Sequence, residues 1–259
     1  MIRIIEEMSL NAWPAHRQML YDGWLLRFSS GFTRRANSVQ PLYPGDLSTA
    51  HRIQTCEQIY AALGLPPLFR ITPIVEPSDL DSVLESVGYK QVHATIVLAG
   101  PLPPQEFDHA LPAGARFHVS DTAHPEDSWL HACATLQGLN VEQSQHLERI
   151  LSGIVTRRLL VRLEIGGRTI ACAMGVIQEA AVGIFQLVTD PDYRRQGVAR
   201  AVVAHLLERS RQFSCRQAYL QVELSNRAAL ALFHKMDFSE IYQYHYRVAS
   251  PRRNVLQSQ

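Results

Sequence analysis

The sequence predicts an α/β protein built on a mixed β-sheet, and three observations lead to this fold class. The chain has 259 residues, of which 46% are hydrophobic and 19% charged, and its mean hydropathy is −0.08, as is typical of a folded globular protein. Strand-like and helix-like patterns alternate along the second half of the chain. A helix–strand pattern of the first half recurs 149 residues later. We therefore expect two halves of similar type, each long enough to bury a core.

Charge, apolar runs and metal-ligand spacing exclude several classes of protein. The formal net charge of +1 lacks the basic excess expected of an electrostatic nucleic-acid binder. No apolar run approaches the roughly 18 residues that span a bilayer, and the first residues contain no apolar signal core, so we expect a soluble cytoplasmic protein. The four cysteines form no CxxC pair and the eleven histidines show no ligand spacing, so neither a disulfide framework nor a metal site is expected.

A proline-rich stretch divides the chain. Residues 101–114 contain Pro-Leu-Pro-Pro and, further on, Leu-Pro-Ala-Gly, a composition that disfavours helices and central strands. We therefore predict a linker over 101–114, an N-terminal domain over 1–100 and a C-terminal domain over 115–250.

Hydrophobic periodicity predicts the elements of the second half in order. A strand over 116–119 precedes two helical patterns over 124–139 and 141–157, the first capped by Asp121 or Thr122. The remaining elements are a hairpin of strands 159–165 and 169–177 that turns at Gly166-Gly167, a strand over 182–189, an amphipathic helix over 198–213, a strand over 218–223, a helix over 226–235 and a tyrosine-rich strand over 238–248.

The first half ends in a pattern similar to the end of the second. Residues 79–89 predict a helix that ends in Gly-Tyr, and an alternating strand follows. At the offset of 149 residues, Leu84 falls on Phe233 and Tyr89 falls on Phe238. An internal duplication explains this repeat, and a chance likeness of two helix–strand units is the alternative.

The turn before the long amphipathic helix carries the strongest chemical signal. Val188-Thr-Asp-Pro191 ends a strand, and Arg194-Arg-Gln-Gly-Val-Ala199 leads into the helix. A helix N-terminus presents unpaired amides and the positive end of the dipole, which bind anions. Gly197 lets a phosphate approach the backbone, and an arginine at 195 or 200 adds a charged contact.

The proline at the end of this strand predicts that the neighbouring strands separate there and leave a slot. The alternative is a plain strand-to-helix turn with surface arginines. Neither a dinucleotide-binding GxGxxG nor a P-loop GxxxxGK[ST] is present in the sequence.

These motifs resemble those of the GCN5-related N-acetyltransferase (GNAT) superfamily. Its [RQ]xxGx[GA] turn corresponds to Arg194–Ala199, and its second motif corresponds to Asn226-Arg-Ala-Ala-Leu-Ala-Leu-Phe-His-Lys-Met-Asp-Phe238. The resemblance covers about 115–248. The segments that begin at Asp22-Gly-Trp, Gly31-Phe-Thr and Leu65-Pro-Pro resemble the leading half of tandem-GNAT proteins. The resemblance thus implies two GNAT-like halves.

The resemblance also implies that acetyl-CoA is the acyl donor. The pantetheine arm would pair with the strand that ends before Pro191, the pyrophosphate would lie on the helix N-terminus, and the Val188 N–H would polarise the thioester carbonyl. The residues that the resemblance assigns to the cofactor are Leu187, Val188, Thr189, Arg195, Gln196, Gly197, Val198, Ala199, Arg200, Asn226 and Phe233.

Two positions depart from the family pattern and leave the general acid and base open. Phe233 stands where many members carry a proton-donating Tyr, and Gln221 stands where some carry a Glu. Glu223 faces the same side of its strand as Gln221 and is our candidate base. Tyr244 is our candidate proton donor, and the alternative is that it is a strand aromatic. Other candidate donors are Tyr242, Tyr246, His234 and, less favoured, His245.

The N-terminal half has no RxxGxA turn, so we expect it to be a degenerate GNAT-like half that binds no CoA. Its expected role is structural, or to form one wall of the substrate cleft. Arg35, Asn37 and Ser38 either reach into that cleft, or the last two close a turn through bonds to the backbone.

The expected function is N-acetyl transfer from acetyl-CoA to a primary amine by direct attack in a ternary complex. A primary amine is largely protonated at pH 7, so a base must remove a proton first. One alternative is a non-catalytic acyl-CoA-binding or sensing protein, and another is an interaction platform. The acceptor is a small-molecule amine or a peptide N-terminus, with no nucleic-acid or membrane partner. Whether the protein is a monomer or a homodimer stays open, with segment 242–246 expected to be exposed.

Overall fold

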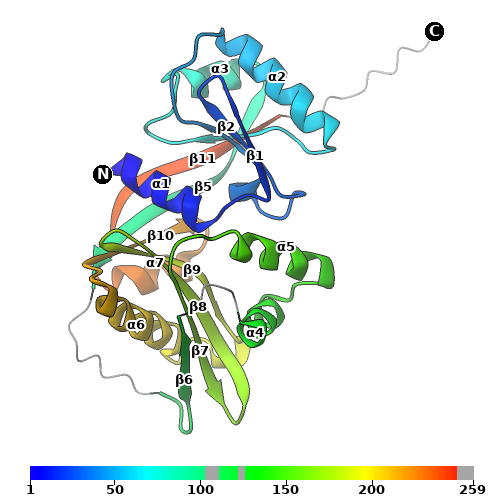
Figure 1. The fold of residues 1–259 in the computed structure, drawn as a ribbon. Coiled ribbons are helices and arrows are strands. Elements are labelled where there is room, and N and C mark those ends of the chain that lie inside the picture. The colour runs from blue at the N-terminus through cyan, green and yellow to red at the C-terminus, as the bar shows by residue number, and fades with distance from the viewer. Residues whose placement is uncertain (103–110, 122–125, 250–259) are drawn as a thin grey trace. The chain divides into compact units, whose positions relative to one another are not determined.

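The chain forms two compact units, neither of which is continuous in sequence (Figure 1). The structure is a computed structural model that describes residues 1–102, 111–121 and 126–249. Unit 1 contains Met1–His16 and Ile96–Tyr242, and unit 2 contains Arg17–Thr95 and the chain from Gln243 onward. This division differs from the expected one at both ends of the chain. The linker residues 103–110 lie outside the described ranges.

Unit 2 is a small sheet covered by two helices. Its strands pair in the order β1-β2-β3-β4-β11, with β3–β4 parallel and the others antiparallel. Apolar side chains of α2 and α3, among them Ile53, Tyr60 and Leu84, share one core with Trp24 and Phe69 of the sheet. The elements are β1 (Arg17–Tyr21), β2 (Trp24–Phe28), η1 (Arg34–Ala36), β3 (Val39–Pro41), α2 (Thr49–Ala62), β4 (Leu68–Ile71) and α3 (Leu80–Ser86), with the first part of β5 (Tyr89–Pro101) and the second part of β11 (Ser239–Ala249).

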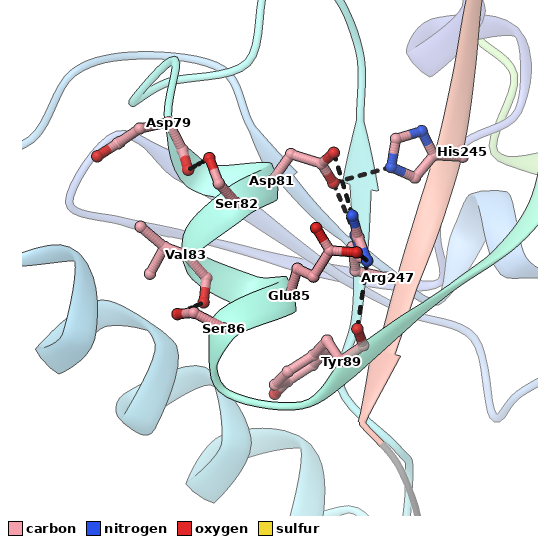
Figure 2. A network of polar contacts seen from close by, with 9 residues as sticks. All are labelled: Asp79, Asp81, Ser82, Val83, Glu85, Ser86, Tyr89, His245 and Arg247. Carbon is pink, nitrogen blue, oxygen red and sulfur yellow. Dashed lines mark hydrogen bonds and ion pairs between the residues drawn. The ribbon is translucent and has the colours of Figure 1, made fainter.

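An ion-pair network ties β11 to α3 within unit 2 (Figure 2). The buried Arg247 guanidinium binds both carboxylate oxygens of Asp81, with Nε–Oδ1 at 2.7 Å and Nη2–Oδ2 at 3.2 Å, and also contacts Glu85 and the Tyr89 carbonyl. The His245 ring lies 2.9 Å from Asp81 Oδ1. Hydrogen bonds from Arg247 hold the pKa of the Asp81 carboxyl below its usual value. This network fixes the last described strand to a distant helix, since Arg247 and Asp81 are 166 residues apart in the sequence.

Unit 1 carries the long sheet and the helices that surround it. Its strands pair in the order β11-β5-β10-β9-β8-β7-β6. Among the described registers, β9–β10 is parallel, whereas β6–β7, β7–β8 and β8–β9 are antiparallel. Its elements are α1 (Ile2–Ala12), β6 (Arg116–Ser120), α4 (Asp127–Gln137), α5 (Val141–Ser152), β7 (Arg158–Ile165), β8 (Arg168–Gln178), β9 (Ala181–Thr189), η2 (Pro191–Tyr193), α6 (Val198–Ser210), η3 (Arg211–Phe213), β10 (Gln217–Glu223) and α7 (Arg227–His234), with the second part of β5 and the first part of β11.

The two faces of this sheet carry different helices. Val161 of β7 and Val182 of β9 share a core with Val202 and Leu206 of α6. A Cβ built at Gly175 of β8 would lie 3.0 Å from Leu206, so a glycine there lets α6 pack closely. On the opposite face, the Trp129 indole of α4 donates to the Val161 carbonyl at 3.0 Å. Figure 1 shows α6 and α4 on opposite sides of β7 and β8.

Two strands pass from one unit into the other. The strand β5 follows α3 of unit 2 and enters unit 1 at Ile96, whereas β11 follows α7 of unit 1 and enters unit 2 at Gln243. After each helix a left-handed residue precedes a buried aromatic at the beginning of the strand region: Gly88 (φ +92°) precedes Tyr89, and Asp237 (φ +62°) precedes Phe238. The two helix–strand patterns therefore share a local conformation. The duplication itself stays a prediction.

Several expected boundaries differ from the observed ones. The helix expected over 141–157 ends at Ser152, because Gly153 caps it and Arg158 already belongs to β7. The expected cap and start of α4 at 122–124 lie outside the described residues. The expectation that segment 242–246 is exposed is wrong, because Tyr242, Tyr244 and Tyr246 are buried. No helix within the described ranges is long and apolar enough to cross a membrane.

Candidate active site

Strand β9 pairs with β8 along its whole length, but it pairs with β10 over only its first residues. Its antiparallel partner β8 follows it from Ala181 to Thr189, whereas its described register with parallel β10 covers only 181–183. Beyond Gly183 the two parallel strands therefore separate within unit 1. The expectation that separation occurs at Pro191 is corrected by this register, because the strands part six residues before the chain leaves the sheet.

Gly183 and Tyr219 occupy the last register position before the strands separate. A Cβ built at Gly183 would lie 2.6 Å from the Tyr219 ring and 2.7 Å from Phe185, so a larger residue would not fit without a shift. The Tyr219 ring also packs edge-to-face on Phe185, with ring centroids 6.3 Å apart. Bulky aromatics thus fill the space next to the point of separation.

A β-bulge lies directly beyond this point. The register between β8 and β9 shifts between the pairs Met174–Phe185 and Cys172–Val188, so one side has an additional residue. Gln186 in the bulge adopts the left-handed conformation, with φ +52°. Bulges re-aim the backbone and are over-represented next to active sites. Leu187, Val188 and Thr189 follow the bulge and are half-buried. The backbone contacts predicted from the sequence for the cofactor therefore lie at the distorted end of this strand.

The turn after β9 leads into α6 with its backbone exposed. Gly197 is the N-cap residue, with φ +81° and ψ −8°, and a Cβ built there would meet no described atom within 4 Å. Arg195 is also left-handed, with φ +60°. Arg195, Gln196 and Arg200 are exposed, Ala199 is half-buried, and Val198 packs in the core below. The arrangement leaves space for an anion in front of the first amides of α6.

Side chains of the turn hold its shape. The Asp190 carboxylate accepts the Asp192 N–H at 3.0 Å and pairs with Arg168 of β8. The Arg194 Nε donates to the Thr189 carbonyl at 3.2 Å, and the Gln196 side-chain amide donates to the Asp192 carbonyl at 2.8 Å. Asp190 and Gln196 thus stabilise the loop itself, while Arg195 and Arg200 lie at its exposed surface.

The other predicted cofactor residues occupy different environments. Asn226 caps α7, and its side chain accepts the Ala229 N–H at 3.1 Å. Phe233 is 2% exposed and packs edge-to-face on Phe238 within the core, with centroids 5.3 Å apart. A role for Phe233 at the thioester end therefore stays a prediction that its burial does not favour.

The two candidate catalytic side chains lie in different units. Glu223 is half-buried at the end of β10 in unit 1, and it shares one strand face with Gln221 because Leu220 and Val222 face the α6 core. Tyr244 belongs to unit 2, where it is buried and the Arg70 guanidinium lies 3.8 Å from its ring centroid. Their predicted roles stay predictions.

In the N-terminal half, Asn37 and Ser38 close a turn. The Asn37 Oδ1 accepts the N–H groups of Ser29 at 2.7 Å and Gly31 at 2.9 Å, and Ser38 Oγ donates to the Arg34 carbonyl at 2.8 Å. Of the two expectations for these residues, the turn is thus the one that the geometry favours.

Sequence reasoning missed a buried carboxylate and an open cavity in unit 1. Glu6 of α1 is buried and accepts a hydrogen bond from Tyr242. The N-terminal sequence gives no signal for it, because Glu6 is followed by Glu7 in a helix that resembles any charged surface helix. A cavity of about 840 Å³ lies between α4, the β7–β8 hairpin and 190–192. The described residues contain no cluster suited to a metal ion.

Comparison with protein families and sequences connects these features to known acetyltransferases. A family model described as "Probable histone acetyltransferase Rv0428c C-terminal" matches residues 1–247. The chain is 26% identical over 250 residues to the "Uncharacterized N-acetyltransferase YobR" of Bacillus subtilis, covering 95% of this chain and 98% of that protein. It is 33% identical over 84 residues to the "[Ribosomal protein bS18]-alanine N-acetyltransferase" of Escherichia coli, covering 32% of this chain and 57% of that protein.

Solved structures show the same fold. A GCN5-related N-acetyltransferase from Kribbella flavida superposes with a TM-score of 0.68 at 15% identity, covering 96% of this chain and 95% of that chain. A tandem GNAT protein from the clavulanic acid biosynthesis pathway superposes with a TM-score of 0.64 at 12% identity, covering 83% of this chain and 76% of that chain. The predicted superfamily and fold class are therefore confirmed.

Proposed function

The chain belongs to the family described as "Probable histone acetyltransferase Rv0428c C-terminal" within the GNAT superfamily and is an acyltransferase, and on this premise we propose that it transfers an acetyl group from acetyl-CoA to a primary amine. The observation that carries the proposal is that an open slot beside β9 and an exposed helix N-terminus lie next to each other in unit 1. The slot beside β9 begins after Gly183, and the exposed N-terminus of α6 lies directly beyond the end of that strand.

The pyrophosphate of acetyl-CoA is proposed to bind the amides at the start of α6. The left-handed Gly197 leaves no side chain in front of these amides, and the helix dipole favours an anion there. The exposed Arg195 and Arg200 supply positive charge within reach of the same loop.

The pantetheine arm is proposed to lie along 187–189. On the side away from β8, this part of β9 has no described register with β10, so outward backbone groups are open to amides of the ligand, apart from the Thr189 carbonyl, which accepts from Arg194.

The oxyanion donor predicted from the sequence is the Val188 N–H. The Asp190 N–H donates to the Ile170 carbonyl of β8 at 2.8 Å, so by the alternation of an antiparallel pair Val188 also faces β8, and the neighbouring N–H groups of Leu187 and Thr189 face the slot. We therefore propose one of these two neighbours as the oxyanion donor.

Transfer is proposed to proceed by direct attack in a ternary complex. The amine nitrogen forms a bond to the thioester carbonyl carbon, the carbon–sulfur bond breaks, and the proton that leaves the nitrogen is balanced by the one that the CoA thiolate takes up. Glu223 is the proposed proton acceptor on β10, and Tyr244 stays the proposed donor from the sequence.

The acceptor is proposed to be a small-molecule amine or a peptide N-terminus. The second class has specific support from the names of two relatives of at least 33% identity over about 80 residues. One is the "[Ribosomal protein bS18]-alanine N-acetyltransferase" of Escherichia coli, and the other is the "N-alpha-acetyltransferase MAK3" of Arabidopsis thaliana. These matches cover about a third of this chain.

Calorimetric titration with acetyl-CoA, followed by an acceptor panel, tests the proposal. The panel contains free lysine, spermidine, an aminoglycoside and a pentapeptide that begins with alanine, and CoA release is followed with a thiol reagent. Micromolar binding and turnover with one amine are expected. Binding without turnover would favour an acyl-CoA sensor, and no binding would overturn the proposal.

A further inference from the structure

A buried carboxylate on α1 has a partner from the far end of the chain. Glu6 is 1% exposed, although carboxylates seldom occur in protein interiors unless they are paired or functional. The hydroxyl of Tyr242, which is 4% exposed, donates a hydrogen bond to Glu6 Oε1. Both residues belong to unit 1, and 236 residues separate them in the sequence.

Glu6 is part of a helical stripe that crosses the sheet of unit 1. Glu6, Ser9 and Trp13 are spaced by three and four residues, so they face the same side of the N-terminal helix region. At one end Glu6 meets Tyr242 of β11, and at the other Trp13 stacks on Phe185 of β9, with ring centroids 6.3 Å apart. Since β5 and β10 lie between β11 and β9, the stripe spans the strands on either side of the slot.

The helix is anchored where β9 and β10 separate. Phe185 directly precedes the left-handed Gln186 of the bulge. The Gln178 side chain at the end of β8 donates to the Met8 carbonyl at 2.8 Å and accepts from the Asn11 side-chain amide at 3.0 Å. These contacts hold the inner face of α1 against the sheet face that also carries Gln221 and Glu223.

A second polar group on the stripe is unsatisfied. Ser9 is 7% exposed, and its Oγ has no hydrogen-bond partner among the residues that the structure describes. A buried hydroxyl without a partner destabilises a protein by about 1–3 kcal/mol. Ser9 lies one helical turn from Glu6, so a hydrogen-bonding group that bound there would satisfy this hydroxyl.

We infer that Tyr242 and Glu6 form a proton relay for the acceptor amine. The Tyr242 hydroxyl takes a proton from the acceptor ammonium as it gives its own proton to the Glu6 carboxylate, in the direction of the observed hydrogen bond. The neutral amine then attacks the thioester carbon, the carbon–sulfur bond breaks, and a nitrogen proton passes to the CoA thiolate. After product release the proton on the buried Glu6 passes back through the Tyr242 hydroxyl to solvent.

This inference rests on the proposed acetyl transfer and deepens it. The relay supplies a carboxylate on the face where β10 carries Gln221 rather than a glutamate, and in this scheme it takes the place of Glu223 as the group that accepts the amine proton. In this scheme Tyr242 contacts the substrate and is the catalytic residue, whereas Glu6 acts through it and is a positioning residue.

The test compares Glu6→Gln and Tyr242→Phe with the matched control Glu7→Gln, an exposed neighbour on the same helix. The best acceptor of the panel is used across pH 6–10, and each variant is also titrated with acetyl-CoA and melted. We expect Glu6→Gln and Tyr242→Phe to lower kcat by about 100-fold, as for loss of a general base. Acetyl-CoA affinity should stay within twofold, and the plateau of kcat/KM at high pH should disappear.

Three results would overturn the inference. The first is a wild-type rate and pH profile in Glu6→Gln. The second is a parallel loss of stability and acetyl-CoA affinity in both variants, which would make the pair a structural anchor. The third is an equal loss of rate in Glu7→Gln. An inactive wild-type protein would instead overturn the proposed function, so the two failures are distinguishable.

Discussion

Replacing Gly197 by glutamate, compared with replacing it by glutamine, distinguishes the effect of charge from that of backbone conformation at the proposed phosphate site. The residue is the N-cap of α6, with φ +81°, and a Cβ there would meet no described atom within 4 Å. A carboxylate at this position would therefore project into the space in front of the helix amides rather than into the core. The matched control is Gly197→Gln, which has the same length and no charge.

Both variants carry the same backbone strain. A side chain in the left-handed region costs about 1–2 kcal/mol, so each variant should lose that amount of unfolding free energy. Because the site is exposed and open, no packing penalty adds to it. Urea denaturation of the two proteins should therefore give equal midpoints, both below that of the wild type.

Only the glutamate variant should lose affinity through charge. A carboxylate about 6 Å from a phosphate is repelled by roughly 1–3 kcal/mol for an effective dielectric constant between those of water and a protein surface. That energy corresponds to a fivefold to hundredfold rise in the Kd for acetyl-CoA. Because salt screens exposed charges, the ratio of the two variants' Kd values should shrink at high ionic strength.

Isothermal titration with acetyl-CoA at low and high salt measures these values. Wild-type affinity in Gly197→Glu would refute the proposed pyrophosphate site. Equal losses in the two variants, unchanged by salt, would show that the conformation at 197 matters and that charge does not.

Three other perturbations follow from the same structure. Gly183→Ala should destabilise unit 1 by about 1–3 kcal/mol in urea melts, because its Cβ would collide with Tyr219. A fragment of residues 101–259 should show no cooperative unfolding by circular dichroism, since it lacks α1 and the part of β5 that belongs to unit 1. Asp81→Asn should lower unfolding free energy by about 2 kcal/mol at pH 7, because Arg247 loses the carboxylate that binds it through two oxygens and keeps only Glu85 as a charged partner among the described residues. The wild-type advantage over this variant should fade as pH falls below about 4, through the lowered pKa of Asp81.

Each of these predictions has a contradicting outcome. Wild-type stability in Gly183→Ala would mean that the aromatics beside it rearrange freely. If the fragment unfolded cooperatively and bound acetyl-CoA, unit 1 would need neither α1 nor the missing part of β5 in order to fold. A difference between Asp81→Asn and wild type that is constant down to pH 2 would remove the ionised carboxylate as its cause.

Local features of the site could be predicted from the sequence. The glycine of the RxxGxA turn and the asparagine that starts the next motif each set the conformation of a few neighbouring residues. In the structure Gly197 is a left-handed N-cap and Asn226 caps α7. A helix terminus depends on its own side chains and dihedral angles, so a short sequence pattern is sufficient to identify it.

Features that join distant segments could not be predicted in the same way. The sequence suggested that strands separate at Pro191, whereas the described β9–β10 register ends at Gly183, where Tyr219 fills the space. The motif also gave no indication that Phe233 would be buried in the core, and its predicted place beside the cofactor stays a prediction. In each case the outcome depends on which side chains from other strands occupy the volume, and the local pattern does not contain that information.

Motif spacing and hydrophobic periodicity are local properties of the sequence, and they were sufficient to predict the superfamily, the mixed α/β class and the glycine turn before α6. Only the tertiary structure decided which residues form each unit, since β5 and β11 each pass from one unit to the other. It alone also brought Glu6 to Tyr242 across 236 residues. Such contacts arise when the whole chain buries its apolar surface, and a buried carboxylate then takes the partner that the packed sheet provides.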